Sequence, residues 1–250
     1  MKRLLYPPLG IALTIILWHW ACVQFKLPTS ALPTPAQVLE AGLGRWDLLL
    51  SEGWVTLKET LYGFLLALAV GIPIAVAVSN SQTLHLMFSP ILIALQSVPK
   101  VALAPILLVW LGTGIESKLA IAWLVAFFPI VVDTSAGLQS TPAPLLELAR
   151  SLRASRWQVF SKVQFPSALP YIVTGSKVAV TLAVIGAVIG EFVGSSEGLG
   201  FLLLSATSQI NSPLAFAALF ALAALGILAY LLVVAIEWLL APWLPHERSD

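Results

Sequence analysis

Long apolar segments, separated by short polar ones, constrain the fold of this chain more than any other feature. Each apolar segment is near the roughly 20 residues that a helix needs to cross a bilayer. Only 10% of the residues are charged, whereas a soluble domain carries roughly a quarter. Backbone polar groups in lipid must be satisfied within their own segment, which favours helices. We therefore predict an all-α membrane protein with one transmembrane domain over residues 1–250 and six transmembrane helices, at about 5–25, 55–79, 85–110, 117–139, 171–192 and 213–241.

The positions of the basic residues predict the orientation of the chain. Short cytoplasmic loops are rich in Lys and Arg, so an inside N-terminus places residues 140–170 and the C-terminus inside as well. Positions 19–22 form no clean cleavage site, and we expect the first apolar segment to be a retained helix. The net charge of +1 does not indicate binding to nucleic acid. The inside residues are then Lys2, Arg3, Arg150, Arg153, Arg156, Lys162 and Arg248, and the outside ones are Lys26, Arg45 and Lys118, with Lys58 near a span entrance.

Residues 141–175 form a basic, proline-punctuated island in this apolar chain. Four of the thirteen Lys and Arg residues fall within it, which is typical of a cytoplasmic docking surface. Pro144 suits the first turn of a helix, where its missing N–H costs nothing. The expected apolar face of this helix comprises Leu145, Leu148, Ala149 and Leu152, and another face carries Glu147, Arg150 and Arg153.

A second short helix is expected to follow in the same island. Ser155 and Gln158 have the spacing of a capping box. Pro166 is expected to end this helix, because the residue before a proline is pushed out of the α region. The island therefore predicts a helix, a turn, a second helix and a proline-rich re-entry into the membrane at 167–171.

The sequence of the island resembles the EAA loop of ABC importer permeases, the binding-protein-dependent transport inner-membrane component family. Glu147-Leu148-Ala149 stands at the Glu-Ala-Ala start, and Phe165-Pro166 stands at the Leu-Pro close. The run 154–157 is most similar to the nitrate/sulfonate/taurine branch. Arg153 replaces the usual Gly, and Arg resists the left-handed conformation that ends a helix.

The resemblance continues along the chain and implies partners and site residues. Ordered matches run from about residue 33 to 242, including 60–64, 97–105 and 191–200. They imply a six-helix permease with a cytoplasmic coupling loop, at about 140–170, between the fourth and fifth helices. They also imply two cytoplasmic ABC ATPases that bind ATP and Mg, a second permease copy in a homodimer, and an extracytoplasmic solute-binding protein in a bacterial inner membrane. The residues implied in ATPase coupling are Glu147, Ala149, Arg150, Arg153, Ala154, Ser155, Arg156 and Trp157.

Several polar residues within the apolar segments are candidates for the transport pathway, because ionisable groups in a membrane are costly. Lys100 lies between Pro99 and Pro105, where the helix is expected to break. It either borders the pathway or joins an ion pair, for which Glu191 is a candidate partner. Glu191 itself either faces the binding protein or packs within the bundle. Gln96, Ser97 and Thr181 either line the pathway or form interhelical hydrogen bonds.

The sequence argues against an enzyme. It contains no phosphate-binding loop of the G-x-x-x-x-G-K-[ST] type and no His/Cys cluster with metal-ligand spacing, so we expect no cofactor in this chain. Residues 194–198 fit the G-x-S-x-G pattern of hydrolases. These residues lie between two apolar segments, and we expect the glycines to shape a turn.

Two classes of function remain for the chain. The first is the permease subunit of an ATP-driven importer for a small solute, of the nitrate/sulfonate/taurine type or, alternatively, a thiamine-pyrimidine precursor or riboflavin-like solute. The second is an ATP-independent secondary transporter, which predicts inverted repeats and carboxylates near the membrane midplane. No central carboxylates or internal repeat are evident, and the basic island favours the importer.

Overall fold

The computed structural model of this chain describes residues 2–240, and within them every regular element is a helix. Arg248 and the end of the expected 213–241 span lie outside the described residues, as do the side chains of Lys2 and Arg3. Two compact units divide the chain: residues 1–56 with 195–224, and residues 57–194 with 225–250. We name them unit 1 and unit 2 and describe each by itself.

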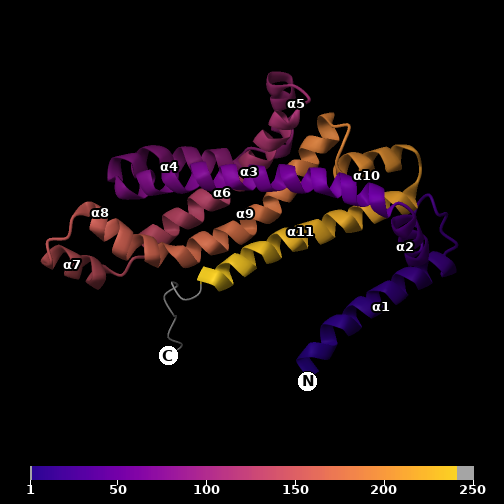
Figure 1. Cartoon of the computed structure of the whole chain (residues 1–250), viewed down its shortest axis with the longest axis horizontal. Helices are drawn as coiled ribbons and strands as arrows, with labels where there is room; N and C mark the ends of the chain where they lie inside the picture. Colours follow the sequence, from indigo (N-terminus) through magenta and orange to yellow (C-terminus); the bar gives the residue numbers. More distant parts are fainter. Residues whose placement is uncertain (1, 241–250) are drawn as a thin grey trace. The chain divides into compact units, whose positions relative to one another are not determined.

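Unit 2 contains most of the long helices (Figure 1). It includes the later parts of α3 and α11, from residues 57 and 225 onward, whereas the earlier parts of both helices belong to unit 1. Its elements are α3 (Trp46–Asn80), α4 (Gln82–Ser97), α5 (Lys100–Leu111), α6 (Ile115–Gln139), α7 (Ala143–Ser151), α8 (Arg156–Val159), the π-helix η1 (Phe160–Gln164), α9 (Phe165–Gly194) and α11 (Ser212–Leu240).

Four helical segments among the described residues are long and apolar enough to cross a membrane. They confirm the spans expected in these regions, although the helices extend beyond the apolar segments. Residues Pro8–Gln24 of α1, where the side chains are described without a gap, form an apolar helix, and the first of the six expected spans stays a prediction. The four segments are Trp46–Asn80, Ile115–Gln139, Arg156–Gly194 and Ser212–Leu239.

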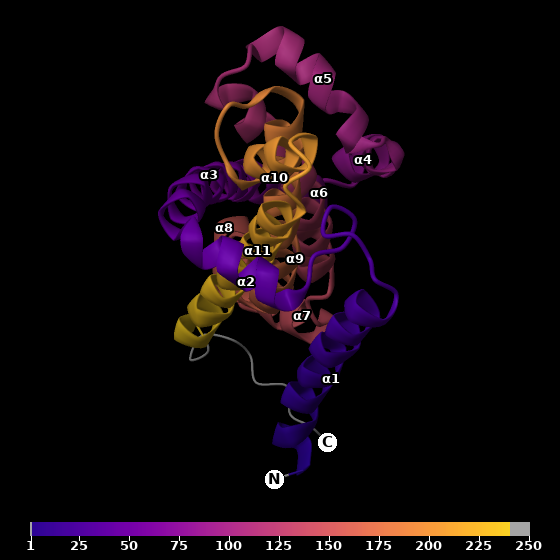
Figure 2. The same cartoon turned by 90° about the vertical axis from the view of Figure 1, so that its right-hand side faces the viewer.

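The span expected at 85–110 is a pair of helices bent by 94° (Figure 2). α4 ends at Ser97, and Val98 is extended, with ψ at 127°. Pro99 explains this geometry, because its ring disfavours the helical conformation of the residue before it. The helix breaks at Val98–Pro99, immediately before the stretch where a break was expected, and α5 continues through Pro105. The segment is a broken span or a re-entrant pair rather than one straight helix.

Glycines hold α3, α6 and α9 at short range around Ala122 of α6, whose side chain is fully buried. A Cβ added to Gly63 of α3 would lie 2.5 Å from the Cβ of Ala122. A Cβ added to Gly186 of α9 would lie 2.6 Å from the Cα of the same alanine. Small residues therefore let the three backbones approach closely, as in other membrane bundles.

A ridge of small residues on α3, at Gly63, Ala67 and Gly71, forms a packing surface. Ala67, four residues after Gly63, is fully buried, and a Cβ on Gly71 would meet the Ile130 side chain of α6 at 2.9 Å. In the first half of α9, Lys177 Nζ forms an ion pair with Glu237 Oε2 of α11 at 2.6 Å. Packing along α6 and this ion pair hold the helices of unit 2 together.

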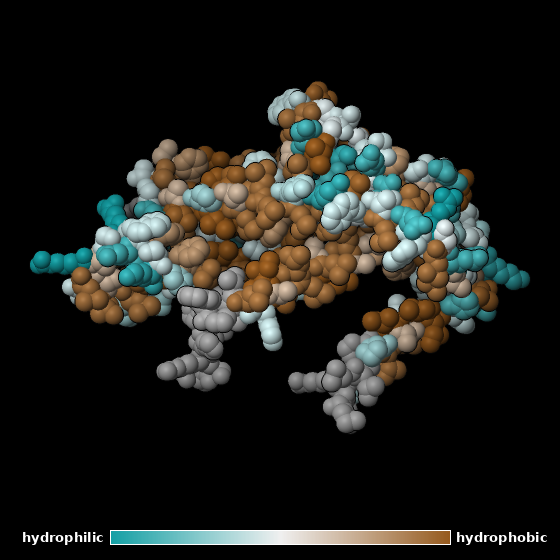
Figure 3. Space-filling view, viewed as in Figure 1, coloured by the Kyte–Doolittle hydropathy of each residue, from teal (hydrophilic) through white to brown (hydrophobic). Residues whose placement is uncertain are grey.

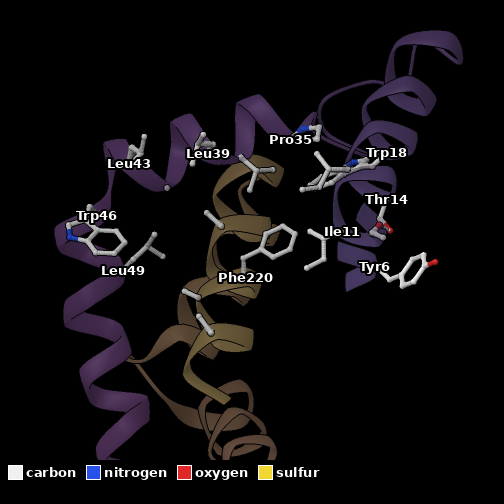
Figure 4. Close-up of a pocket in the computed structure, with 17 residues that line it drawn as sticks. Tyr6, Ile11, Thr14, Trp18, Pro35, Leu39, Leu43, Trp46, Leu49 and Phe220 are labelled. Atoms are coloured by element: carbon white, nitrogen blue, oxygen red, sulfur yellow. Dashed lines mark hydrogen bonds between the residues drawn. The ribbon is translucent and has the colours of Figure 1, made fainter. Parts of the chain in front are cut away.

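Unit 1 contains α1 (Lys2–Gln24), α2 (Pro35–Gly44), the start of α3, α10 (Leu199–Ser208) and the start of α11. A capping box begins α2: Thr34 Oγ1 accepts from Gln37 N, and Gln37 Oε1 accepts from Thr34 N. A groove of about 880 Å³ lies between α1, α2, α3 and α11 (Figure 4). Its wall is almost entirely apolar, and the ring of Trp18 of α1 lies 5.9 Å from that of Phe220 of α11, centroid to centroid.

We predict that the Gly63→Ala variant is less stable than the wild-type protein, by about 1–3 kcal/mol for overpacking of a filled interior. The new methyl group would displace Ala122, and thereby α6, from α3. Gly226→Ala is the matched control, because a Cβ there meets nothing within 4 Å. Thermal unfolding of the two purified variants measures the difference. Equal melting temperatures would show that the helices separate freely at Gly63.

Candidate functional site

The segment between α6 and α9 folds into α7, α8 and η1, as the alternation of apolar and basic residues in the island predicts. α7 begins at Ala143 with Pro144 in its first turn. Hydrophilic side chains lie beside hydrophobic ones over α7 and α8 (Figure 3). The basic residues of this segment are all exposed: Arg150, Arg153, Arg156 and Lys162.

The apolar face of α7 differs from the expected one. Ala149 is buried at 7% exposure, whereas Leu148 is 57% and Leu152 73% exposed. The single face expected for Leu145, Leu148, Ala149 and Leu152 is therefore wrong, because Ala149 points into the protein while the leucines point outward. Large apolar side chains exposed together indicate a surface that binds a partner.

Arg153 adopts the left-handed conformation that its side chain disfavours, with φ at +51°. The N–H of Arg153 donates to Arg150 O at 2.9 Å, and the N–H of Ala154 donates to Ala149 O at 3.0 Å. These two bonds form a Schellman motif, which satisfies carbonyls at the end of α7. Arg therefore occupies the usual glycine position with the backbone geometry of a glycine turn.

α8 begins with the expected capping box, which is confirmed. Ser155 Oγ accepts from Gln158 N at 3.3 Å, and Gln158 Oε1 accepts from Ser155 N at 2.8 Å. This cap fixes the start of the helix and leaves Trp157 72% exposed. The Trp157 ring contacts that of Phe160, with centroids 5.6 Å apart. Leu148, Leu152 and Trp157 are the exposed apolar side chains that we call the loop anchors.

Pro166 does not end the second helix, contrary to expectation. Helical backbone continues from Arg156 to Gly194, and the N–H of Phe165 donates to Phe160 O, five residues back. In an α-helix the ring of Pro166 would clash with the carbonyl of Lys162. The wider π-turn of η1 removes that clash, so the proline is accommodated within one long helix.

The residues proposed for the pathway lie in different surroundings. Lys100 Nζ donates to Gln96 O at 3.0 Å and lies 4.9 Å from the centroid of the Phe128 ring, a cation–π distance. Gln96 and Ser97 are exposed at the end of α4. The break at Pro99 thus brings Lys100 to Gln96 and to α6.

Thr181 and Glu191 both belong to α9. Thr181 Oγ1 donates to Val178 O at 2.8 Å, within its own helix. The Glu191 side chain is 1% exposed, so it packs within the protein in this conformation. The Thr181 hydrogen bond therefore lies within α9 and is not the interhelical bond that we considered.

An ion pair that the sequence interpretation missed joins α3 to α6. Lys118 Nζ lies 3.3 Å from Glu59 Oε1, and their side chains are 9% and 1% exposed. Gly190 of α9 packs on the Lys118 backbone, since a Cβ there would meet the Lys118 Cα at 3.0 Å. Lys118 is thus buried within the protein and paired with Glu59. Two opposite charges within neighbouring apolar spans were the signal that could have revealed this pair.

Known proteins share the sequence and the fold. The family described as "Binding-protein-dependent transport system inner membrane component" matches residues 67–244. A probable ABC transporter permease protein of Haemophilus influenzae is 36% identical over 95% of this chain and 96% of its own length. The formylaminopyrimidine transport permease protein ThiX of Halalkalibacterium halodurans is 36% identical over 97% of this chain and 98% of its own.

A taurine transporter and a solved structure extend these similarities. The taurine transport system permease protein TauC of Escherichia coli is 32% identical over 94% of this chain and 87% of its own length. A structure of the MetNI methionine ABC transporter in an inward-facing conformation has a TM-score of 0.69, with 24% identity, 77% of this chain and 96% of that chain covered. This chain therefore shares the fold of that transporter chain.

We predict that Arg153→Gly slows hydrogen exchange of the residue 153 and 154 amides about fivefold, because glycine carries no penalty in the left-handed conformation. Exchange mass spectrometry of the turn measures this change. Arg150→Gly is the matched control: it removes the same charge but places glycine inside α7, so exchange should accelerate. Faster exchange in both variants would contradict a favourable Schellman turn.

We predict that neutralising one partner of the Glu59–Lys118 pair destabilises the protein strongly. Lys118→Met or Glu59→Met leaves a buried charge, at a cost of about 3–5 kcal/mol. The double variant should regain most of the lost stability, because it leaves no unpaired charge in the interior. Thermal unfolding of the four proteins measures the coupling. Additive losses in the double variant would show that the two charges do not stabilise each other.

Proposed function

Because this chain belongs to the binding-protein-dependent transport system inner membrane component family, we propose that it forms the translocation pathway of an ATP-driven importer. A solute-binding protein outside the membrane delivers a small solute to it. Two cytoplasmic ABC ATPases, which bind ATP and Mg, supply the energy. A second, identical permease chain completes the pathway, since symmetric pairs are the commonest assemblies.

The observation that carries the coupling role is the exposure of the loop anchors. Leu148, Leu152 and Trp157 are between 57% and 73% exposed, on short helices whose ends are fixed by a Schellman motif and a capping box. Central apolar anchors with a charged rim are typical of protein–protein contacts. Arg150, Arg153 and Arg156 form that rim and favour a partner with an acidic border.

The site residues have separate roles in this proposal. Ala149 holds α7 against its own subunit, and the Ser155 cap orients α8. Ala154 donates the bond that closes the turn. Glu147 and the three arginines are exposed and contact the ATPase.

Coupling requires two arrangements of the permease. The ATPases bind ATP, and ATP can shift the equilibrium between the two arrangements only if it binds the complex more tightly in one arrangement than in the other. Packed helices move as rigid bodies between discrete arrangements. The continuous helix from Arg156 to Gly194 joins the loop to a membrane span, so movement of α8 is transmitted along α9.

The pathway and the orientation complete the proposal. Both termini and the α7–α8 loop are cytoplasmic, in a bacterial inner membrane. Gln96, Ser97, Lys100, Thr181 and Glu191 remain the pathway or gate candidates, with Lys100 available to attract an anionic solute.

The proposed solutes follow from the relatives. Transport permeases for taurine, aliphatic sulfonates and nitrate are similar to this chain, as are those for formylaminopyrimidine and riboflavin. We assign the solute to the nitrate/sulfonate/taurine type, with a thiamine-pyrimidine precursor or riboflavin-like solute as the alternative. The binding protein makes the selection between them.

We predict that Glu147→Ala, Arg156→Glu or Trp157→Ala abolishes ATP-driven uptake while the chain still inserts into the membrane. Each change alters the exposed loop surface and leaves the span cores intact. Uptake by the complete complex in liposomes, with the amount of inserted chain measured in parallel, tests this result. Arg45→Glu is the control, an exposed charge reversal beside α2. Normal uptake by the loop variants would contradict the coupling role.

A further inference from the structure

One carboxylate within the α6 span has no part in the coupling loop or in the ion pairs described above. Asp133 is the only charged residue between Lys118 and Glu147, and its side chain is partly exposed. Among the groups that the structure describes, none is hydrogen-bonded or ion-paired to this carboxylate. Ionisable groups within spans are costly in lipid and face a solute pathway, a water-filled cavity or a partner group. Asp133 therefore requires water or a polar solute beside it.

Asp133 lies on the seam where α6 packs against α9. A Cβ added to Gly175 of α9 would lie 2.9 Å from Asp133 Oδ2, so the absence of a side chain at Gly175 leaves room for the carboxylate. One turn further along α6, Gly137 also packs on α9, since a Cβ there would lie 2.7 Å from the Tyr171 Cβ. This second contact closes the seam between Asp133 and the end of α6 at Gln139.

The seam has an exposed edge beside the carboxylate. Tyr171 and Val178 lie about one turn on either side of Gly175 on α9, and they are 43% and 46% exposed. On α6, Val132 directly precedes Asp133 and is 42% exposed. By helix geometry these exposed side chains lie on one side of the seam. We call the surface formed beside Asp133 by Val132, Tyr171, Thr174 and Val178 the α6–α9 strip.

The polar groups of the α6–α9 strip accept hydrogen bonds. The ionised carboxylate of Asp133 has acceptor oxygens and no donor. Thr174 is exposed and donates its hydroxyl proton to Pro170 O at 2.9 Å, which leaves its oxygen as an acceptor. The ring of Tyr171 can bind a cation on its face. The strip is therefore complementary to a group that carries positive charge and N–H donors.

Two lysines of unit 2 that could neutralise Asp133 have other partners. Lys177 follows Gly175 by two residues and so lies on the opposite face of α9. There its ammonium pairs with Glu237 at 2.6 Å. Lys100 donates to a carbonyl oxygen of α4 at 3.0 Å. The negative charge of Asp133 is thus available to a solute.

From these contacts we infer that Asp133 borders the transport pathway and binds an ammonium or amino group of the solute, with Tyr171 and Thr174 beside it. Thr181, a pathway candidate, lies one turn beyond Val178 on the same side of α9. Asp133 is then a specificity-determining residue. It favours an amine-bearing solute, of the taurine or aminopyrimidine kind, over nitrate. This solute class rests on the proposed function, whereas the position of Asp133 beside water does not depend on ATPase coupling.

A reporter cysteine on the α6–α9 strip measures the charge that a passing solute meets. Cys22, the single cysteine, is changed to Ser, and Val178 is changed to Cys. The full chain in lipid nanodiscs, without ATPase or binding protein, is labelled with two hydrophilic methanethiosulfonates of opposite charge. One carries a trimethylammonium group and the other a sulfonate group. The ratio of their two labelling rates removes differences in thiol reactivity between variants.

Asp133→Asn should lower the ratio of trimethylammonium to sulfonate labelling about tenfold, because a nearby charge in water changes the two rates in opposite directions. Tyr171→Leu should slow trimethylammonium labelling about threefold and leave sulfonate labelling unchanged, because only the cation binds the ring face. Glu116→Gln is the matched control, since it removes an exposed carboxylate from the first turn of the same helix. The ratio should not change in this variant.

Two results would overturn the inference. A reporter that neither reagent labels would show that the α6–α9 strip faces lipid or protein rather than water. An equal ratio with Asp133 and with Asp133→Asn would show that the carboxylate does not act on the strip. Either result would leave the importer assignment standing, because no ATPase, binding protein or solute takes part in the labelling. Loss of the importer assignment, from a complete complex without ATP-driven uptake, would in turn leave the labelling ratio unchanged.

Discussion

The close approach of α3, α6 and α9 at Ala122 is the contact on which unit 2 depends. Gly63 and Gly186 lie on either side of this alanine, with no room for a further methyl group. Apolar helices gain little from leaving lipid for one another, so association relies on close packing and on polar contacts. The Glu59–Lys118 pair adds such a polar contact between α3 and α6. Glycine packing and a buried ion pair thus fix the same helices.

This packing supports the coupling role that we propose for the α7–α8 loop. The loop connects α6 to α9, and the helix that begins at Arg156 continues without interruption to Gly194. The π-turn at η1 makes this continuity compatible with Pro166. A force applied to Trp157 therefore acts on a long helix packed along α6, and a packed helix moves as a rigid body. Exposed leucines on α7 are consistent with a partner at this position.

The sequence predicted those features of the fold that depend only on residues close together in the chain. The Ser155 capping box and the break at Pro99 follow from side-chain and ring geometry, and both are present. The accommodation of Pro166 and the left-handed Arg153 were not predicted, because a π-turn and a Schellman motif offset local penalties that spacing alone overstates. The Glu59–Lys118 pair joins positions far apart in sequence. The sequence analysis assigned Lys118 to an external segment and did not consider Glu59, so it did not predict this contact.

The most direct test of the central claim is to purify the tagged chain gently from its native membrane. Mass spectrometry then identifies the proteins that accompany it and any small molecule released from them. A permease that binds ATPases through Leu148, Leu152 and Trp157 should retain an ABC ATPase, and should lose it when Trp157 is changed to Ala. A wild-type chain that carries no ATPase and moves solute across liposomes without ATP would contradict the importer assignment.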